Sequence, residues 1–294
     1  MTLASTRRID AHLHLWDLDS GGYAWLTPEH GALYSTFTAE QARAELDAAG
    51  VELAILVQAE DTLRDTDYLL GVANENPWVA AVVGWVPLDE PRAAEAALDR
   101  WSENPAFRGV RHLLHDDPRT EFLELAQVRS SLSLLARQGL AFEVPDAWPA
   151  HLDQARDVAR ALPELTVVVD HLAKPPVGGD AFGAWHSSFD AVAALPNTVA
   201  KVSGLTLPGV PFTAEALRPA WDAALELFGP PRLMYGGDWP ISVQFGGYQR
   251  AWAVYSEWIS ELSAAEQEHI LWNTAVATYS VTDVKSHDSS PSKC

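Results

Sequence analysis

Residues 166–171 read Thr-Val-Val-Val-Asp-His, so three consecutive valines lead directly into two polar side chains. Branched apolar residues on successive positions, without polar alternation, are typical of a strand that is buried on both faces. Such strands occur in parallel sheets whose two faces are covered by other elements. The segment therefore predicts an α/β fold with a parallel sheet, and Asp170 and His171 mark the end of one of its strands.

Similar apolar segments recur along the chain, and segments with helical periodicity separate them. The expected strands are Ile9–Leu15, Val51–Gln58, Val79–Val86, Gly109–Leu113, Leu140–Val144, Thr166–His171, Thr198–Leu205 and Arg232–Asp238. The expected helices are Ala39–Ala49, Asp65–Glu75, Arg92–Trp101, Phe122–Gln138, Pro149–Leu162, Phe182–Leu195, Ala214–Phe228, Tyr248–Leu262 and a final Ala264–Tyr279. Strand and helix alternate at about 30 residues per unit, which predicts an eight-unit (β/α)8 TIM-like barrel with an extra C-terminal helix.

A doubly wound open sheet is the alternative to the barrel. It is disfavoured because no Gly-x-Gly-x-x-Gly motif follows an expected strand and no phosphate-binding loop motif occurs. No linker is long enough to divide the chain, so we expect residues 1–280 to form a single barrel domain. Residues 281–294 are polar, and we expect them to be a disordered tail.

The composition excludes several kinds of partner. The 294 residues carry 40 acidic and 20 basic side chains, a formal charge of −20. Such a field repels phosphate backbones and anionic lipids, so we expect a small-molecule substrate and neither a nucleic-acid nor a membrane partner. Cys294 is the sole cysteine and the N-terminus lacks an apolar signal core, which favours a cytoplasmic protein. The oligomeric state is left open.

Polar side chains gather at the expected carboxyl ends of the strands, where barrel enzymes hold their active sites. In chain order these ends carry His12 and His14, Arg111 and His112, Glu143, Asp170 and His171, Lys201 and Ser203, and Asp238 with Trp239. The interior of a barrel is otherwise filled by branched apolar side chains. Six polar strand ends therefore predict a functional site at one mouth of the barrel.

His12 and His14 flank Leu13, so both imidazoles point to the same side of the first strand. Two imidazoles directed at one point are able to chelate a divalent cation or to bracket a substrate oxygen. The alternative is that one of them is a hydrogen-bonded core histidine.

Asp238 follows two glycines and precedes Trp239 and Pro240. A carboxylate that is half-buried against aromatic rings has a raised pKa and is able to accept a proton from water, which predicts a general base. The alternative is an aspartate that caps the following helix. For His171 the alternative to a catalytic role is a structural imidazole bonded to a backbone carbonyl.

The remaining strand ends support substrate binding less directly. Arg111 is suited to a two-pronged contact with a carboxylate, or to a structural ion pair with an acidic residue. An inward pair of Lys201 and Glu143 would satisfy both side chains without any catalytic role. Three tryptophans in expected strand-to-helix loops are candidates for an apolar wall of a pocket: Trp16, Trp25 and Trp239. The alternative is that they only pack against the rest of the protein.

Six segments in series resemble the amidohydrolase superfamily. They are IDAHLHLWD (9–17), VVGWVPLDEP (82–91), FRGVRHLLHDDP (107–118), TVVVDHLAKPP (166–176), VAKVSGL (199–205) and RLMYGGDWPIS (232–242). More narrowly they are similar to its lactonase-like branch, which includes fuconolactonase-type sugar lactonases and 2-pyrone-4,6-dicarboxylate lactonase. The resemblance extends from about Ile9 to Tyr279 and implies a distorted (β/α)8 barrel that hydrolyses a cyclic ester or a related carbonyl compound.

The resemblance also implies roles for individual residues. The catalytic residues it implies are His12, His14, His171 and Asp238. The substrate contacts we expect are Arg111, His112, Glu143, Lys201 and Trp239. Superfamily members with two metals use a lysine or glutamate at the end of the fourth strand and a histidine at the end of the fifth. Here the fourth strand ends in Arg111 and His112, and the fifth carries Glu143, so a binuclear centre is not expected. One divalent ion, zinc, held by His12, His14 and Asp238 is expected, and metal-independent activity is the alternative.

The function implied is a hydrolase that opens a small-molecule lactone, of a sugar acid or a carboxylated ring, with water activated by Asp238. The alternative is an amide hydrolase or a non-oxidative decarboxylase of the same superfamily. A catalytically inactive barrel that only binds ligands is disfavoured, because every expected catalytic position carries a competent side chain.

Overall fold

A ring of eight parallel strands forms the centre of the molecule. The computed structural model describes residue 3, residues 7–20 and residues 22–282. The strands are β1 (Ile9–Leu13), β2 (Leu53–Val57), β3 (Val79–Gly84), β4 (Phe107–Arg111), β5 (Ala141–Val144), β6 (Val167–Val169), β7 (Thr198–Val202) and β8 (Leu233–Tyr235). Each strand pairs in parallel with the next one in the sequence. The strand expectations are confirmed, although most strands are shorter than expected.

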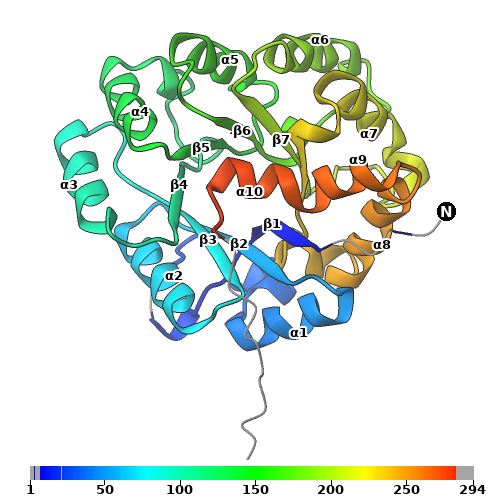
Figure 1. Ribbon diagram of the computed structural model, residues 1–294, viewed down its shortest axis with the longest axis horizontal. Helices are drawn as coiled ribbons and strands as arrows, with labels where there is room; N and C mark the ends of the chain where they lie inside the picture. Colours follow the sequence, from blue (N-terminus) through cyan, green and yellow to red (C-terminus); the bar gives the residue numbers. More distant parts are fainter. Residues whose placement is uncertain (1–2, 4–6, 21, 283–294) are drawn as a thin grey trace, which may run out of the picture.

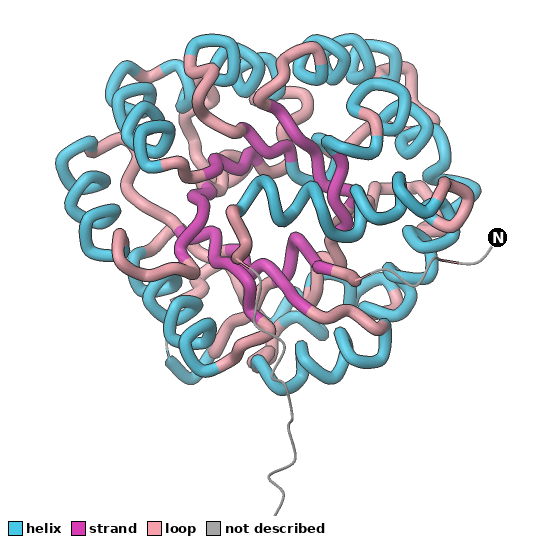
Figure 2. The backbone as a smooth tube through the Cα atoms, in the orientation of Figure 1, coloured by secondary structure: helices cyan, strands magenta, loops and turns pink. Residues whose placement is uncertain are grey.

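Helices surround the strands on the outside (Figure 1 and Figure 2). They are α1 (Ala39–Ala49), α2 (Leu63–Glu75), α3 (Pro91–Trp101), α4 (Ala126–Gln138), α5 (Leu152–Ala161), α6 (Phe182–Ala193), α7 (Ala214–Phe228) and α8 (Tyr248–Ile259). The C-terminal helical segment consists of α9 (Ala264–Glu268), a π-helical turn (His269–Asn273) and α10 (Thr274–Tyr279). The expected (β/α)8 barrel with an extra C-terminal helix is therefore confirmed.

The barrel closes between its first and last strands, beyond the end of β8. Leu13 and Trp239 form a parallel bridge, and the backbone N–H of His14 donates a 2.7 Å hydrogen bond to the carbonyl of Trp239. The backbone N–H of Asp238 donates a 2.8 Å bond to the carbonyl of His12. The residues that close the barrel thus belong to the two segments with the expected metal ligands.

The extra C-terminal helix covers one end of the barrel. A buried cluster inside the ring contains Ile55, Val57, Val83 and Val168 from the strands, and Tyr279 of α10 packs against it. In Figure 1, α10 crosses the middle of the ring of strands. Because apolar interior side chains must be shielded from water, α10 closes the end of the barrel from which the strands start, and the opposite end remains for the site.

Two capping boxes begin helices where the sequence predicts them, at Thr38 with Gln41 and at Ser263 with Glu266. The expected helix Phe122–Gln138 is interrupted at Leu125, whose backbone is extended, so that a short turn (Phe122–Glu124) precedes α4. Most of the expected polar tail, residues 281–294, lies outside the described residues. Among the described residues, no helix has both the length and the apolar character needed to cross a membrane.

Candidate active site at the mouth of the barrel

A cavity of about 170 Å³, partly open to solvent, lies at the carboxyl ends of the strands. Its wall is formed by His14, Trp16, Trp25, Ala59, Arg111, Leu113, His115, Asp116, Pro145, Asp146, His171, Lys174, Asp238 and Ile241. Four of the residues expected to act in catalysis or substrate binding are among them, and so are two of the three expected tryptophans. The cavity is therefore the candidate active site.

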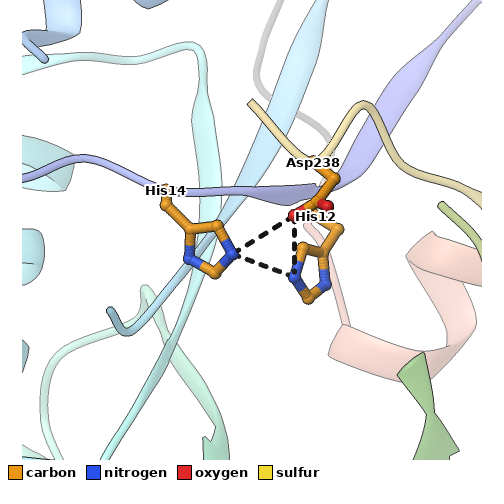
Figure 3. A group of neighbouring side chains, drawn as sticks. All are labelled: His12, His14 and Asp238. Atoms are coloured by element: carbon orange, nitrogen blue, oxygen red, sulfur yellow. Dashed lines mark hydrogen bonds and ion pairs between the residues drawn. The ribbon is translucent and has the colours of Figure 1, made fainter. Parts of the chain in front are cut away.

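His12, His14 and Asp238 converge on one another (Figure 3). His14 and Asp238 line the cavity, whereas His12 is fully buried beside them. The Nε2 atoms of the two histidines are 3.1 Å apart. Oδ1 of Asp238 lies 3.8 Å from Nε2 of His12 and 3.6 Å from Nε2 of His14. The alternation of His12, Leu13 and His14 along the strand thus produces the juxtaposition that the sequence predicts.

Hydrogen bonds at the far nitrogens fix both imidazole rings. Nδ1 of His14 lies 2.8 Å from the carbonyl oxygen of Val57, which only accepts, so Nδ1 carries the proton and Nε2 presents a lone pair. Nδ1 of His12 lies 3.5 Å from a carboxylate oxygen of Asp170 and 3.1 Å from Nζ of Lys201. Burial lowers the pKa of both histidines below the ordinary value, which favours neutral rings.

Two glycines allow Asp238 to approach the first strand. A Cβ on Gly236 would lie 2.6 Å from the Cβ of His12, and a Cβ on Gly237 would lie 2.3 Å from the ring of Tyr248. Asp238 itself has a left-handed backbone with φ of 51°, which aspartate tolerates better than most residues. The Gly-Gly-Asp segment is therefore a consequence of the close approach that carries the carboxylate to the histidines.

The electrostatics of Asp238 differ from the expectation. Burial does oppose ionisation, as expected, but His171 and His14 outweigh it and lower the pKa of Asp238 below its ordinary value. The expected raised pKa is therefore wrong, because the sequence does not show how closely the two imidazoles surround the carboxylate. Asp238 is ionised at neutral pH and is available as a proton acceptor or a metal ligand.

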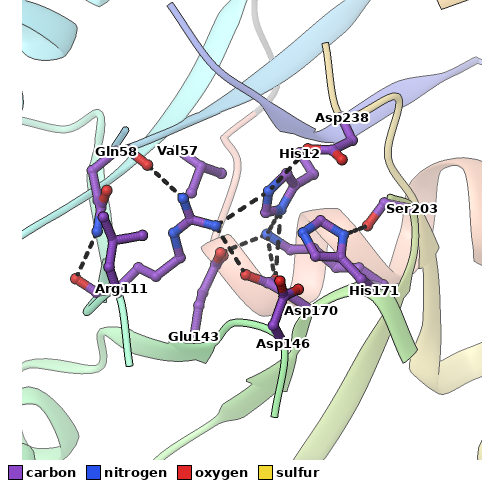
Figure 4. A network of polar contacts seen from close by, with 12 residues as sticks. His12, Val57, Gln58, Arg111, Glu143, Asp146, Asp170, His171, Ser203 and Asp238 are labelled. Carbon is purple, nitrogen blue, oxygen red and sulfur yellow. Dashed lines mark hydrogen bonds and ion pairs between the residues drawn. The ribbon is translucent and has the colours of Figure 1, made fainter. Parts of the chain in front are cut away.

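A network of buried charges lies beneath His12 (Figure 4). Nζ of Lys201 lies 2.7 Å from Oε2 of Glu143 and 3.3 Å from Oδ1 of Asp170. The hydroxyl of Tyr279, from α10, donates to the other carboxylate oxygen of Glu143. Lys201 and Glu143 are fully buried and are not on the cavity wall. The structural Lys–Glu pair that the sequence left open is therefore present, and the expected substrate contacts of the two residues stay a prediction.

The pKa values in this network follow from burial and from the Lys201 ammonium. Burial raises the pKa of Glu143 to about 7, against the attraction of Lys201. Burial also opposes ionisation of Asp170, but Lys201 and His12 hold its pKa well below the ordinary value. Asp170 is therefore the carboxylate that neutralises Lys201 next to His12.

His171 and Arg111 both reach the cavity wall. Nδ1 of His171 lies 2.9 Å from the hydroxyl of Ser203. This nitrogen therefore contacts a side chain and not the backbone carbonyl that the structural alternative requires. Arg111 donates a 2.7 Å hydrogen bond to the carbonyl of Gln58, and its NH1 lies 3.4 Å from Oδ2 of Asp170. Arg111 thus combines the two roles that the sequence left open, an ion pair and a position on the wall.

His112 and Trp239 lie outside the cavity wall, and their expected contact with the substrate stays a prediction. His112 is stacked on Phe122 at 4.1 Å, and its two ring nitrogens face Asp61 at 3.2 Å and Asp117 at 3.0 Å. Trp239 is buried and packs edge-to-face on Phe37. His112 follows Arg111, which does line the cavity, and successive residues of a strand point to opposite sides.

Several wall residues were not singled out from the sequence: His115, Asp116, Asp146 and Lys174. Asp170 was noted at a strand end but given no role. Lys174 follows three residues after His171, and Asp146 follows two residues after β5. Their position just past a strand end is the signal that could have identified them, since loops at this end of a barrel supply substrate contacts.

The group of His12, His14 and Asp238 fits a divalent metal ion. The three candidate ligand atoms lie within 4.8 Å of one another. Ligand atoms bound tetrahedrally to zinc at about 2.0–2.1 Å are about 3.3 Å apart, close to the separations found here. The lone pair on Nε2 of His14 and the ionised carboxylate are suitable donors, and Val57 is the outer hydrogen-bond partner of His14. Nε2 of His12 would join them when its ring proton is on Nδ1, which faces Asp170 at 3.5 Å.

The chain is similar to several known proteins over most of its length. An L-fucono-1,5-lactonase of Burkholderia ambifaria is 36% identical over 257 residues, which cover 86% of this chain and 87% of that protein. An L-fucono-1,5-lactonase of Burkholderia multivorans is 29% identical over 289 residues, covering 94% and 97%. The crystal structure of a Burkholderia multivorans amidohydrolase with bound zinc has 29% identity and a TM-score of 0.85, covering 94% of this chain and all of that one.

The amidohydrolase family model matches residues 9–281, which include all eight strands of the barrel and every residue of the site. The chain therefore belongs to the amidohydrolase family.

Proposed function

We propose that this chain hydrolyses a small-molecule lactone, specifically the 1,5-lactone of a sugar acid. The observation that carries the proposal is the ionised carboxylate of Asp238 beside two neutral imidazoles, at the base of a cavity with aromatic and charged walls. The similarity to two L-fucono-1,5-lactonases supports the substrate class.

Asp238 acts as the general base in this proposal. Its Oδ1 faces the two imidazoles, whereas its Oδ2 is turned towards Gly204, and a carboxylate oxygen accepts a proton from water. The water oxygen forms a bond to the ring carbonyl carbon, and the bond between that carbon and the ring oxygen then breaks. The departing alkoxide takes the proton from Asp238, so the carboxylate is regenerated. General acid–base help of this kind accelerates reactions by typically about 10²–10⁴-fold.

Charged and hydrogen-bonding groups on the wall stabilise the negative charge that develops on the carbonyl oxygen. The guanidinium of Arg111 lies on the cavity wall, and its NH1 is 3.4 Å from Nε2 of His12. His171 lines the same wall and is held by Ser203. Loss of one such group typically costs about 3–4 kcal/mol of transition-state stabilisation.

His12, His14 and Asp238 would hold one divalent ion, and we propose that the ion is zinc. When bound, such an ion supplies Lewis acidity at the carbonyl oxygen and lowers the pKa of a bound water. The outer partners Val57 and Asp170 keep the two imidazoles in the orientation that this ligand set requires.

The wall of the cavity suits a neutral ring with several hydroxyl groups. Trp16 and Trp25 pack edge-to-face and offer apolar surface, as expected from the sequence. Lys174 offers a cation, and Asp116 and Asp146 offer acceptors. Hydroxyl groups both donate to carboxylates and accept from cations, whereas an anionic ring would be repelled by the two aspartates.

Three readouts test the proposed function against the alternatives. Opening of a sugar 1,5-lactone releases a proton near neutral pH, decarboxylation of a hydroxybenzoate releases carbon dioxide, and amide hydrolysis releases ammonia. We expect rapid proton release with sugar lactones such as L-fucono-1,5-lactone and no carbon dioxide or ammonia from the other substrates. Release of carbon dioxide or ammonia, with no enzymatic opening of any lactone, would contradict the proposal.

A further inference from the structure

Lys174 and Asp146 face each other across a gap on the cavity wall. Nζ of Lys174 lies 3.9 Å from Oδ1 of Asp146, which is too long for a direct hydrogen bond. Nζ is held in place by a 2.6 Å bond to the carbonyl of Gly204 and retains two further donor protons. Oδ1 of Asp146 is shielded from solvent and accepts no hydrogen bond from any residue that the structure describes.

The backbone at both positions is unfavourable for residues that carry a Cβ. His171, Leu172, Ala173 and Lys174 form a run of left-handed residues with φ of 54°, 50°, 60° and 54°, and φ of Asp146 is 44°. Left-handed conformations at consecutive non-glycine residues persist only where the surroundings enforce them, and they concentrate at functional sites. The turn brings both His171 and Lys174 to the cavity wall.

Hydrogen bonds from neighbouring elements hold the left-handed turn. The indole N–H of Trp185 donates to the carbonyl of Leu172 at 3.1 Å, and the backbone N–H of Trp148 donates to the carbonyl of Ala173 at 3.2 Å. The position of Lys174 is therefore determined by the folded barrel and not by the lysine side chain alone.

We propose that Lys174 and Asp146 bind one ring hydroxyl of the sugar lactone and thereby determine specificity for it. The inference rests on the proposed function and names the group that this part of the site recognises. A ring hydroxyl within hydrogen-bond distance of both side chains accepts a bond from Nζ of Lys174 and donates one to the Asp146 carboxylate, whose side chain is 36% exposed and lines the cavity. A carboxylate has no proton to donate to Asp146, and a methyl group satisfies neither residue.

The pair lies between the cavity and a second hollow. Lys174 and Asp146 also line this hollow, which is bordered by Trp148 and Leu207 and not by His12, His14 or Asp238. Neither residue takes a proton from water or contacts the reacting carbonyl in the proposed mechanism, so recognition of the hydroxyl should affect substrate binding more than the chemical step.

The substitution Lys174→Met removes the cation and retains the shape of the side chain. We expect kcat/KM for a sugar 1,5-lactone to fall by about 10–100-fold, the usual effect of losing a hydrogen bond to a charged group, mainly through KM. The value for δ-valerolactone, which has no ring hydroxyl, should fall much less. Asp146→Asn, which tolerates the same left-handed backbone, should also weaken the preference for the hydroxylated ring.

A set of monodeoxy sugar lactones identifies the hydroxyl. One member should be a poor substrate for the wild-type protein and should lose nothing more in Lys174→Met, because both changes remove the same interaction. Asp180→Asn, an exposed acid beyond the same turn, is the control for a change of charge.

Equal losses for the sugar lactone and δ-valerolactone in folded Lys174→Met and Asp146→Asn would overturn the inference and leave the proposed function intact. Absence of lactone opening by the wild-type protein would overturn the proposed function and the inference with it. Circular dichroism and thermal unfolding identify a variant that fails to fold, in which case the other variant decides.

Discussion

The backbone N–H of Asp238 donates a 2.8 Å hydrogen bond to the carbonyl oxygen of His12. This bond joins the loop after the last strand to the first strand, and the Leu13–Trp239 bridge lies next to it. Closure of the barrel and assembly of the catalytic group are therefore the same structural event. Changes at this junction are expected to affect activity before they unfold the rest of the barrel.

Metal content tests the ligand set directly. We expect protein purified with zinc to contain about one ion per chain, the number that a single group of three ligands and a water holds. His14→Asn should weaken zinc binding by more than the ~10–100-fold typical of losing an outer partner. His115→Asn, which changes a histidine on the wall outside the ligand set, is the matched control. Elemental analysis showing full zinc content in His14→Asn would contradict the assignment.

Gly204 permits the close approach of His171 and Asp238. Its φ is 53°, and a Cβ there would lie 2.3 Å from Nδ1 of His171 and 2.7 Å from Oδ2 of Asp238. We expect Gly204→Ala to lose most of its kcat and to be destabilised by about 1–3 kcal/mol through overpacking. Gly209→Ala is the control, because Gly209 is also left-handed but has no atom within 4 Å of the added methyl group. Similar kcat values and melting temperatures for the two variants would refute this explanation.

Lys201 lies between two carboxylates in the interior. Lys201→Met leaves Glu143 without its cation and Asp170 with only the 3.4 Å contact to Arg111, and breaking a buried ion pair in this way costs about 3–5 kcal/mol. The double variant Lys201→Met/Glu143→Gln should recover part of that loss, since it removes one of the uncompensated charges. Denaturant unfolding at pH 7 measures both. A single variant as stable as the wild type would show that the network contributes nothing to stability.

Asp65 makes stability depend on pH. Burial raises its pKa from 3.8 to about 6, although Tyr23, Ala59 and Glu60 donate hydrogen bonds to it. The folded state therefore binds a proton at Asp65 more tightly than the unfolded state does. The contribution of this proton to the free energy of unfolding is complete below pH 3.8 and is lost as the pH rises through about 6. Compared with Asp65→Asn, the wild type should lose about 3 kcal/mol of its free energy of unfolding over this range, because the pKa differs by about two units between the folded and unfolded states.

The measurement is the free energy of unfolding of both proteins between pH 3 and pH 8, a window that spans both pKa values of Asp65. Asp47→Asn, which changes an exposed carboxylate on α1, should follow the wild-type curve. Parallel curves for wild type and Asp65→Asn would show that Asp65 has the same pKa in the folded and unfolded states.

The sequence was sufficient for the order of strands and helices. Consecutive apolar residues such as Val167–Val169 identify strands that are buried on both faces, and amphipathic segments with capping boxes identify the helices between them. Strand ends were less accurate. β6 stops at Val169 because a left-handed turn follows, and β8 stops at Tyr235 because Gly236 packs against His12.

The candidate site was predictable to the extent that it consists of polar residues at strand ends. His12, His14, His171 and Asp238 come together as expected because all parallel strands present their carboxyl ends at the same mouth. His112 lies off the cavity wall because it is adjacent to Arg111, which lines the wall, and neighbours on a strand point in opposite directions.

The sequence did not show how deep a polar side chain lies along the barrel axis, nor which residues have a left-handed backbone. Glu143 and Lys201 are strand residues like His12, but the stagger of the strands places them below the cavity. Lys174 and Asp146 reach the wall because their backbones are left-handed, a conformation that no local pattern of non-glycine residues indicates.

The central claim is that the carboxylate of Asp238 activates water for lactone opening, and Asp238→Asn tests it most directly. Asparagine has the same shape, tolerates φ of 51° and keeps the N–H that binds His12, so the fold should be unchanged by circular dichroism. We predict that kcat for a sugar 1,5-lactone falls by about 10²–10⁴-fold, measured by proton release. A folded Asp238→Asn protein that opens the lactone at nearly the wild-type rate would contradict the claim.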